Sequence, residues 1–290
     1  MLTYQTIREL CQAAEQAGTV ISQVILADQS QALELEEAVL YEQMSARLQV
    51  MEEAARAGMD PDLRSASGLS GGDGARMNQY AQSGGVAGPF LNGAIARALA
   101  VSEYNAAMGK IVAAPTAGSC GILPGTLLSA LEAGQCSRER AVMALFTAGG
   151  IGMVIGNQAT LAGAEGGCQA ECGSAAAMAA AALAELKGGT PAQAAHACAM
   201  ALKNQLGLVC DPVAGLVEVP CIKRNAAGVV IALAAAEMAL AGIESKIPAD
   251  ECITAMYQVG CALPSALRET AQGGLAATPT GLRLKREIFG

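Results

Sequence analysis

The sequence predicts an all-α protein that folds as one compact helical domain over residues 1–290. Hydrophobic residues make up 52% of the chain, enough to bury a large core, yet aromatic residues make up only 3%. Val, Ile, Thr and aromatic residues rarely occur in runs, so little of the sequence favours strands. Ala and Gly are abundant instead, and their small side chains let helices pack closely. We therefore expect helices throughout, with Gly-rich loops collected at one place.

The first half of the chain predicts helices separated by two Gly-rich segments. Apolar residues at helical spacing, Ile7, Leu10, Cys11 and Ala14, predict an amphipathic first helix. Further helices are expected over residues 40–55 and 94–108. Between them, residues 58–93 hold nine glycines in 36 residues, and residues 113–125 read AAPTAGSCGILPG. Both segments are predicted to be ordered active-site loops, the second leading into another helix.

The second half carries clearer helix boundaries. Thr190 is a predicted N-cap, because Pro191 follows it at the first helical position, and Gly207 is expected to end that helix. Residues 226–241 are almost all apolar and predict a central, buried helix. Pro248 is expected to open the next helix.

Charge and hydropathy exclude several kinds of partner. The formal net charge is −8 and no basic patch is found, so no nucleic-acid partner is expected. The N-terminus has no apolar signal core. The longest uncharged run, residues 141–164, contains five glycines as well as Asn157 and Gln158, which favours a buried segment over a membrane span. We expect a cytoplasmic protein with no membrane partner.

The ten cysteines are expected to be reduced thiols, and most of them to be small core residues. Cys168 and Cys172 form a C-x3-C pair whose spacing places both thiols on one face of a helix. Cys210 and Cys221 bracket CDPVAGLVEVPC, where nearby prolines fix the backbone. Cysteines in rigid turns are better placed as ligands than cysteines on a helix face. The spacing therefore allows a metal or iron–sulfur site made of Cys210, Cys221 and one of Cys168 and Cys172.

Histidine and glycine narrow the chemistry further. His196 is the one histidine, and we expect it to be structural. A Ser-His-Asp triad or a His-rich zinc site built within this chain is excluded, because no second histidine is present. Gly-rich turns ahead of helices expose backbone N–H groups and can bind an anion such as a carboxylate. They can equally be tight turns that bind nothing. The candidate anion-binding residues are Ser67, Ser70 and Gly71 in the first loop, and Thr116, Gly118 and Ser119 in the second.

Four long segments resemble one known family. They are SGLSGGDG, PTAGSCGILPG, GNQATLAGAEGGCQAECGSAAAMAAA and LGLVCDPVAGLVEVPCIKRNA. They are similar to the alpha chain of iron–sulfur-dependent L-serine dehydratase (L-serine ammonia-lyase), in the form with separate alpha and beta chains, and the likeness extends over essentially the whole chain.

The resemblance implies a [4Fe–4S] cluster held by Cys168, Cys210 and Cys221, with one iron open as a Lewis acid. It implies elimination of water from L-serine to give pyruvate and ammonia, with no pyridoxal phosphate. The Gly-rich loops would then hold the carboxylate of serine.

The chain departs from the family pattern in three places. The family's proposed catalytic base is a histidine in an S-S-H-T-like motif of the beta portion, and this chain has no such motif. The catalytic base is therefore unknown here and is expected on a beta chain. The last cysteine is Cys261, so a C-terminal cysteine that caps the open iron in single-chain relatives is expected to be absent. Residues 203–205, Lys-Asn-Gln, stand where many relatives have two histidines.

Three other functions remain compatible with these residues. The chain could be a non-catalytic iron–sulfur or redox-sensing protein with the same fold. It could be a cysteine desulfidase-type lyase on a similar helical scaffold. It could also be a metal-free helical assembly protein whose ten thiols all lie in the core.

Overall fold

The computed structural model describes residues 4–290, and within that range it is built from helices and connecting loops without a strand. The one strand-like contact there is an isolated parallel bridge between Cys210 and Arg268. The all-α prediction is therefore confirmed.

The α-helices in chain order are α1 (Ile7–Gln16), α2 (Ile21–Leu33), α3 (Glu37–Ala57), α4 (Asp73–Gln82), α5 (Gly88–Ala106), α6 (Ile122–Glu132), α7 (Arg138–Gln158), α8 (Gly163–Gly166), α9 (Ser174–Leu186), α10 (Pro191–Lys203), α11 (Cys221–Leu240), α12 (Ala249–Ala262) and α13 (Pro279–Phe289). The shorter helices are η1 (Ala117–Ser119), η2 (Gln169–Gly173), η3 (Val213–Gly215), η4 (Ser265–Leu267) and η5 (Gly274–Ala277); η2 is a π-helix.

The predicted helix starts agree with the caps in the structure. The hydroxyl of Thr190 accepts the backbone N–H of Gln193 (3.2 Å), and the Gln193 side chain accepts the N–H of Thr190 (2.9 Å), which forms a capping box. Pro191 occupies the first turn as predicted. The helix ends at Lys203 rather than at Gly207, because the chain turns over the next residues and Gly207 adopts φ +84° beyond them. Pro248 precedes α12, as expected.

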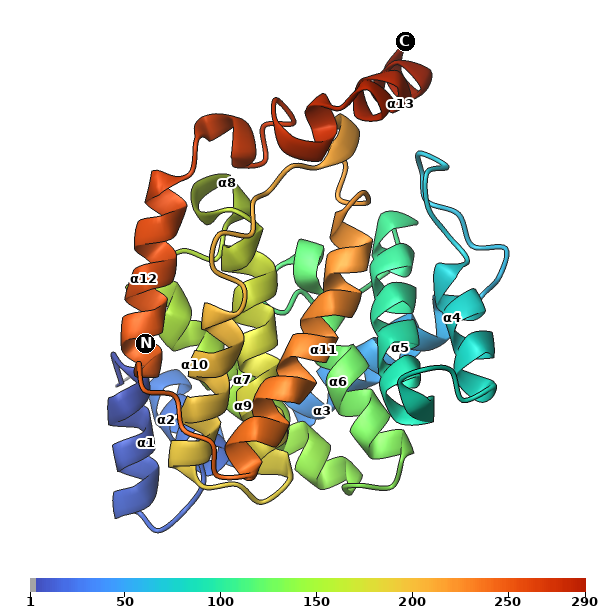
Figure 1. Ribbon diagram of the computed structural model, residues 1–290. Coiled ribbons are helices and arrows are strands. Elements are labelled where there is room, and N and C mark those ends of the chain that lie inside the picture. The colour runs from blue at the N-terminus through green and yellow to red at the C-terminus, as the bar shows by residue number, and fades with distance from the viewer. Residues whose placement is uncertain (1–3) are drawn as a thin grey trace.

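The centre of the bundle is α9, and not the helix predicted from residues 226–241. Almost every residue of α9 is buried, and it packs against α6, α7, α10 and α11 (Figure 1). Its alanines allow these four neighbours to approach closely. The predicted central helix, α11, has an exposed stripe formed by Lys223, Ala227, Val230, Ala234 and Glu237. The prediction was wrong because alanine is compatible with a solvent-facing position as well as with the core.

The first Gly-rich segment is more helical than predicted. Residues 58–93 contain all of α4 and the start of α5, so this segment is not one loop. A Cβ atom on Gly58 or on Gly74 would collide with the backbone of Ala100 in α5. These two glycines therefore allow helix ends to pack on α5. Residues 58–72 remain irregular and project from the bundle beside α4 (Figure 1).

The long uncharged run belongs to α7. This helix is long and apolar enough to cross a membrane, but 67% of its most apolar 18-residue stretch is buried inside the protein. It packs on α2, α3 and α9. Burial in the core explains its composition.

The cysteines singled out above lie together at one end of the bundle. Helix α8, π-helix η2, the start of α11 and the segment that follows α12 meet there (Figure 1). Helices α10 and α12 begin beside α1 at the opposite end of the bundle and run toward this one. We call the two regions the cysteine end and the cavity end.

Candidate functional site

Three separate segments deliver the three predicted ligands to the cysteine end. Cys168 immediately precedes η2, Cys210 follows α10 in extended backbone, and Cys221 is the first residue of α11. All three are buried, with exposed fractions of 2%, 3% and 5%. The backbone N–H of Cys210 donates to the carbonyl of Leu267, and its carbonyl accepts the N–H of Glu269, each at 2.8 Å. The segment after α12 thereby fixes Cys210 in place.

The sulfur atoms of Cys168 and Cys172 are in contact. They lie 3.5 Å apart, because these residues, four positions apart, lie on the same side of the turn that includes η2. Spacing alone left the choice between the two cysteines open, and the structure brings both to the site. Cys210 also lies close enough to Cys168 to change its pKa. Cys168 therefore lies between Cys172 of η2 and the segment that holds Cys210.

The surroundings favour a thiolate at Cys168. Hydrogen bonds with Cys172 and Cys210, together with the positive charge of Arg224, hold the pKa of Cys168 well below its usual range, despite burial. The same contacts with Cys168 raise the pKa of Cys172 and of Cys210. Burial, and then the nearby Cys168, raise the pKa of Cys221 to about 12. One negative charge is thus favoured among four neighbouring thiols.

A buried ion pair places Arg224 beside Cys168. The guanidinium donates to Asp211 Oδ1 and to the carbonyl of Val209, each at 2.8 Å. The side chains of Arg224 and Asp211 are only 15% and 4% exposed. Asp211 Oδ2 accepts the backbone N–H of Leu275 (2.8 Å), which ties the C-terminal segment to the same pair. The cation near the thiols is therefore held rigidly.

The second Gly-rich loop lies against the cysteines. Thr116 donates its hydroxyl to Glu171 Oε1 (2.7 Å) and lies 3.2 Å from the hydroxyl of Ser119. Asn225, one turn after Cys221, donates to the carbonyls of Gly118 (2.8 Å) and Cys221 (3.0 Å). The structure therefore brings together the predicted residues of this loop and the predicted ligands.

Glu171 is the carboxylate nearest to the thiols. A Cβ on Gly163 would lie 2.6 Å from Glu171 Oε2 and 3.2 Å from Cys210 Sγ, so both atoms border the same glycine. A Cβ on Gly118 would lie 3.1 Å from Glu171 Oε1. Burial, opposed by the Thr116 hydrogen bond, raises the pKa of Glu171 to about 7. Two glycines thus leave space for this carboxylate beside the sulfur atoms.

The first Gly-rich loop is held by a different carboxylate. Ser67 and Ser70 donate their hydroxyls to Glu218 Oε1 (2.8 Å) and Oε2 (2.7 Å), and Glu218 is only 5% exposed. Gly71, at φ +138°, packs directly on the backbone of Leu63. Each serine hydroxyl has one proton, so those of Ser67 and Ser70 are already used. The structure ties this loop to the Cys210–Cys221 loop through Glu218.

The donor set at this end fits an anionic iron–sulfur cluster. Three buried thiols, the cation of Arg224 and a buried Arg268 Nε that lacks a hydrogen-bond partner lie around Cys210. Among residues 4–290, no three His, Cys, Asp or Glu side chains are arranged around a single metal ion. A multi-iron cluster has a different requirement, because its cysteines bind different irons and need not converge on one point.

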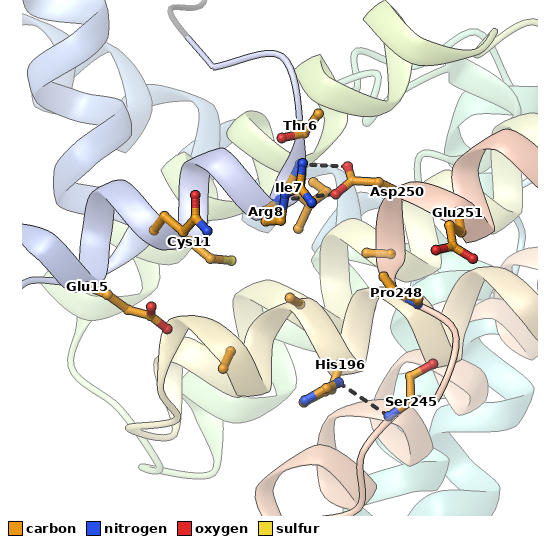
Figure 2. Close-up of a pocket in the computed structure, with 14 residues that line it drawn as sticks. Thr6, Ile7, Arg8, Cys11, Glu15, His196, Ser245, Pro248, Asp250 and Glu251 are labelled. Carbon is orange, nitrogen blue, oxygen red and sulfur yellow. Dashed lines mark hydrogen bonds between the residues drawn. The ribbon is translucent and has the colours of Figure 1, made fainter.

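A separate cavity lies at the cavity end, away from the four thiols. It measures about 460 Å³ and is lined by α1, α10 and the start of α12 (Figure 2). His196 faces it and accepts the backbone N–H of Ser245 at Nδ1 (3.3 Å). Cys11 donates to the carbonyl of Pro191 (3.3 Å). Both residues have backbone partners, which agrees with the structural role predicted for His196.

Sequence reasoning missed the charged residues of the site. Glu171 lies three residues after Cys168, and Glu218 and Arg224 each lie three residues from Cys221. Acidic and basic residues at short spacing from candidate ligands were a signal that could have found them. Their partners Thr116, Ser67 and Ser70 are 55, 151 and 148 residues away, which spacing does not reveal.

Comparisons with known proteins agree on one family. Residues 16–276 match the family described as serine dehydratase alpha chain. The chain is 51% identical over 288 residues to the probable L-serine dehydratase, alpha chain, of Bacillus subtilis, covering 99% of this chain and 96% of that one. It is 46% identical over 285 residues to the L-serine dehydratase, alpha chain, of Peptoniphilus asaccharolyticus, covering 98% of each. L-serine dehydratase TdcG of Escherichia coli is 47% identical over 181 residues, which are 62% of this chain and 40% of that protein.

Proposed function

Because the chain belongs to the serine dehydratase alpha-chain family, we propose that it is the alpha subunit of an L-serine dehydratase that converts L-serine to pyruvate and ammonia. The observation that carries the proposal is the meeting of Cys168, Cys210 and Cys221 at one end of the bundle, beside the second Gly-rich loop. Three thiols, a small polar loop and a carboxylate at one place suit a small polar substrate.

We infer that Cys168, Cys210 and Cys221 hold a [4Fe–4S] cluster. When bound, a cluster with three thiolate ligands supplies a Lewis acid that makes the serine hydroxyl a better leaving group. Arg224 favours the thiolate form of Cys168, and the N-terminus of α11 favours that of Cys221 through the helix dipole. The protein alone thus favours one negative charge, at Cys168, and the positive iron ions of a bound cluster would compensate those of Cys210 and Cys221. No pyridoxal phosphate is part of the proposal.

The second Gly-rich loop is proposed to hold the substrate carboxylate. Residues 116–119 precede α6 near the thiols, and within the described chain the backbone N–H groups of Ala117 and Gly118 have no acceptor. Ser119 supports this loop from inside, because it is buried and its N–H and hydroxyl both donate to the Thr116 carbonyl (3.4 Å each). Asn225 orients this loop by binding the carbonyl of Gly118. For the first loop the proposed role is indirect. Ser67 and Ser70 hold the Cys210–Cys221 loop through Glu218, and Gly71 allows close packing of this loop on Leu63.

The base that removes the Cα proton is proposed to come from a beta chain. His196, the one histidine of the sequence, lies at the cavity end and accepts a backbone N–H. In the elimination, the base takes the Cα proton, the Cα–H electron pair forms the C=C bond as the Cβ–O bond breaks, and the leaving hydroxide takes up a proton to become water. The resulting aminoacrylate becomes an imine, and addition of water to it releases ammonia and pyruvate.

Anaerobic reconstitution with iron and sulfide, followed by addition of a beta chain and L-serine, tests the proposal. We expect broad absorption near about 400 nm and formation of pyruvate. Absorption without pyruvate would instead indicate a non-catalytic iron–sulfur protein. Sulfide release from cysteine would indicate a desulfidase, and a colourless protein would show that the thiols bind no cluster.

The two loops are tested separately. Ser119→Ala is expected to raise the KM for serine about threefold, because it removes the hydroxyl that holds Thr116 and with it the backbone N–H groups of the loop. Ser70→Ala is expected to reduce stability by about 1–2 kcal/mol, since it leaves Glu218 with one donor, and to change KM little. A large KM increase in Ser70→Ala alone would indicate instead that the first loop binds the substrate carboxylate.

A further inference from the structure

Glu171 is the one feature of the site that the proposed reaction does not yet use. Its Oε1 atom is fixed by the Thr116 hydroxyl at 2.7 Å. Its Oε2 atom faces Gly163, at the border with Cys210 Sγ. The side chain is half-buried, whereas the four thiols around it are buried. A small ligand that reaches the thiols therefore meets this carboxylate.

The carboxylate lacks a cation. Within residues 4–290, none of the ion pairs includes Glu171. Arg224, the cation beside Cys168, donates to Asp211 and to Val209. A carboxylate in a partly desolvated site is stabilised when a positive group binds to it.

We propose that Glu171 binds the α-ammonium group of the amino-acid substrate and so makes the enzyme specific for 2-amino acids. The inference rests on the proposed function. It assigns the two charged ends of serine to two neighbouring groups: the ammonium group to Glu171, and the carboxylate to the backbone N–H groups of the loop that Thr116 ties to Glu171.

Glu218 does not fit this role. It is 5% exposed, and each of its oxygens already accepts a serine hydroxyl. Glu171 has one occupied oxygen and Gly118 and Gly163 on either side, where any Cβ would close the approach. The difference in packing separates a carboxylate that holds a loop from one that is open to a ligand.

The test compares L-serine with L-glycerate, which has a hydroxyl in place of the ammonium group, on the reconstituted complex with its beta chain. Glu171→Gln keeps the acceptor for Thr116 but removes the charge. We expect it to raise the KM for L-serine about 10- to 100-fold and to change the inhibition constant of L-glycerate less than about threefold. Glu171→Asp, which keeps the charge, should give an intermediate KM.

Glu165→Gln is the matched control. Glu165 is exposed and accepts the hydroxyl of Thr160 at 2.6 Å, so it repeats the Thr–Glu hydrogen bond on the protein surface. Absorption near about 400 nm and the thermal unfolding midpoint, measured for every variant, verify that cluster content and folding are retained.

Two results would overturn the assignment. Equal increases for serine and glycerate would mean that Glu171 does not distinguish the ammonium group. A fall in kcat with unchanged KM would mean that it acts in the chemical step. If the wild-type complex forms no pyruvate, the proposed function fails instead, which is a separate outcome.

Discussion

The two ends of the bundle contain similar residue types in different electrostatic surroundings. At the cysteine end, neighbouring thiols and Arg224 lower the pKa of Cys168. At the cavity end, burial and then the carboxylates of Glu15 and Asp250 raise the pKa of Cys11 to about 12, and its thiol contacts a backbone carbonyl. A cavity of about 460 Å³ therefore lies beside a thiol whose surroundings favour the neutral form, whereas the surroundings of Cys168 favour a thiolate (Figure 2). The comparison teaches that a cavity and a thiol with a lowered pKa need not occur at the same place.

The largest difference between the ends should appear on removal of a thiol. Cys168→Ala, Cys210→Ala and Cys221→Ala should each reduce pyruvate formation by more than about 100-fold. Loss of a hydrogen bond to a metal ligand reduces activity about 10- to 100-fold, and loss of the ligand itself should have a larger effect. Each should also reduce the absorption of reconstituted protein near about 400 nm.

Cys11→Ala and Cys198→Ala are the controls. Cys11 lies at the cavity end, and Cys198 is buried within α10. Both should retain activity and absorption, at a cost of about 1 kcal/mol in stability from the lost side-chain volume. Loss of the absorption in either control would break the distinction between the two ends. The resemblance implies Cys168, and not Cys172, as a ligand, so Cys172→Ala should retain activity.

Breaking the buried ion pair should give the next largest effect. Asp211→Asn leaves Arg224 buried with a neutral partner and should lower the free energy of unfolding by about 3 kcal/mol. The surface pair of Arg138 and Glu52, with side chains 44% and 25% exposed, provides the comparison. Glu52→Gln should cost less than about 1 kcal/mol. Urea unfolding of both variants measures the difference, and equal costs would show that the Asp211 pair is not specially buried.

Loss of a helix cap at the cavity end should give a smaller effect. Asp250 accepts the backbone N–H groups of Ile7 (2.8 Å) and Arg8 (3.1 Å) at the start of α1. Asp250→Ala should reduce the free energy of unfolding by about 1 kcal/mol, as for other lost caps, and should leave KM and kcat unchanged. Steady-state kinetics and urea unfolding check the two parts. A change in KM would connect the cavity end to the reaction.

Local signals in the sequence were sufficient for the helices, and insufficient for the contacts that complete the site. Thr190 and Pro191 mark a helix start because a cap depends on neighbouring residues alone. Gly58 and Gly74 contributed to the prediction of a loop. In the structure these glycines allow close packing on Ala100, which lies in another helix. Spacing allowed Cys210 and Cys221 as ligands, but Arg224, Glu171 and Glu218 depend on partners brought together only by the fold.

The smallest effect is expected from Glu185, the cavity-end counterpart of Glu171. It lies at the end of α9 away from the cysteines, where both carboxylate oxygens accept the backbone N–H of Ser22 (3.3 Å). Burial raises its pKa above 4.5, so the folded state binds a proton more tightly than the unfolded state. Its contribution to stability is therefore full at low pH and decreases as pH rises through the raised pKa.

Glu185→Gln should remove this dependence. The free energy of unfolding of the wild type, relative to that of the variant, should fall as pH rises above 5, with a slope of at most about 1.4 kcal/mol per pH unit for one proton. Urea unfolding between pH 5 and 8 measures it. Glu139→Gln is the control, because a hydrogen bond with Ser137 lowers the pKa of Glu139 and places its titration below this range. A flat difference for Glu185→Gln would show that burial does not shift the pKa of this carboxylate. Glu171 would then owe its raised pKa to Cys168 rather than to burial.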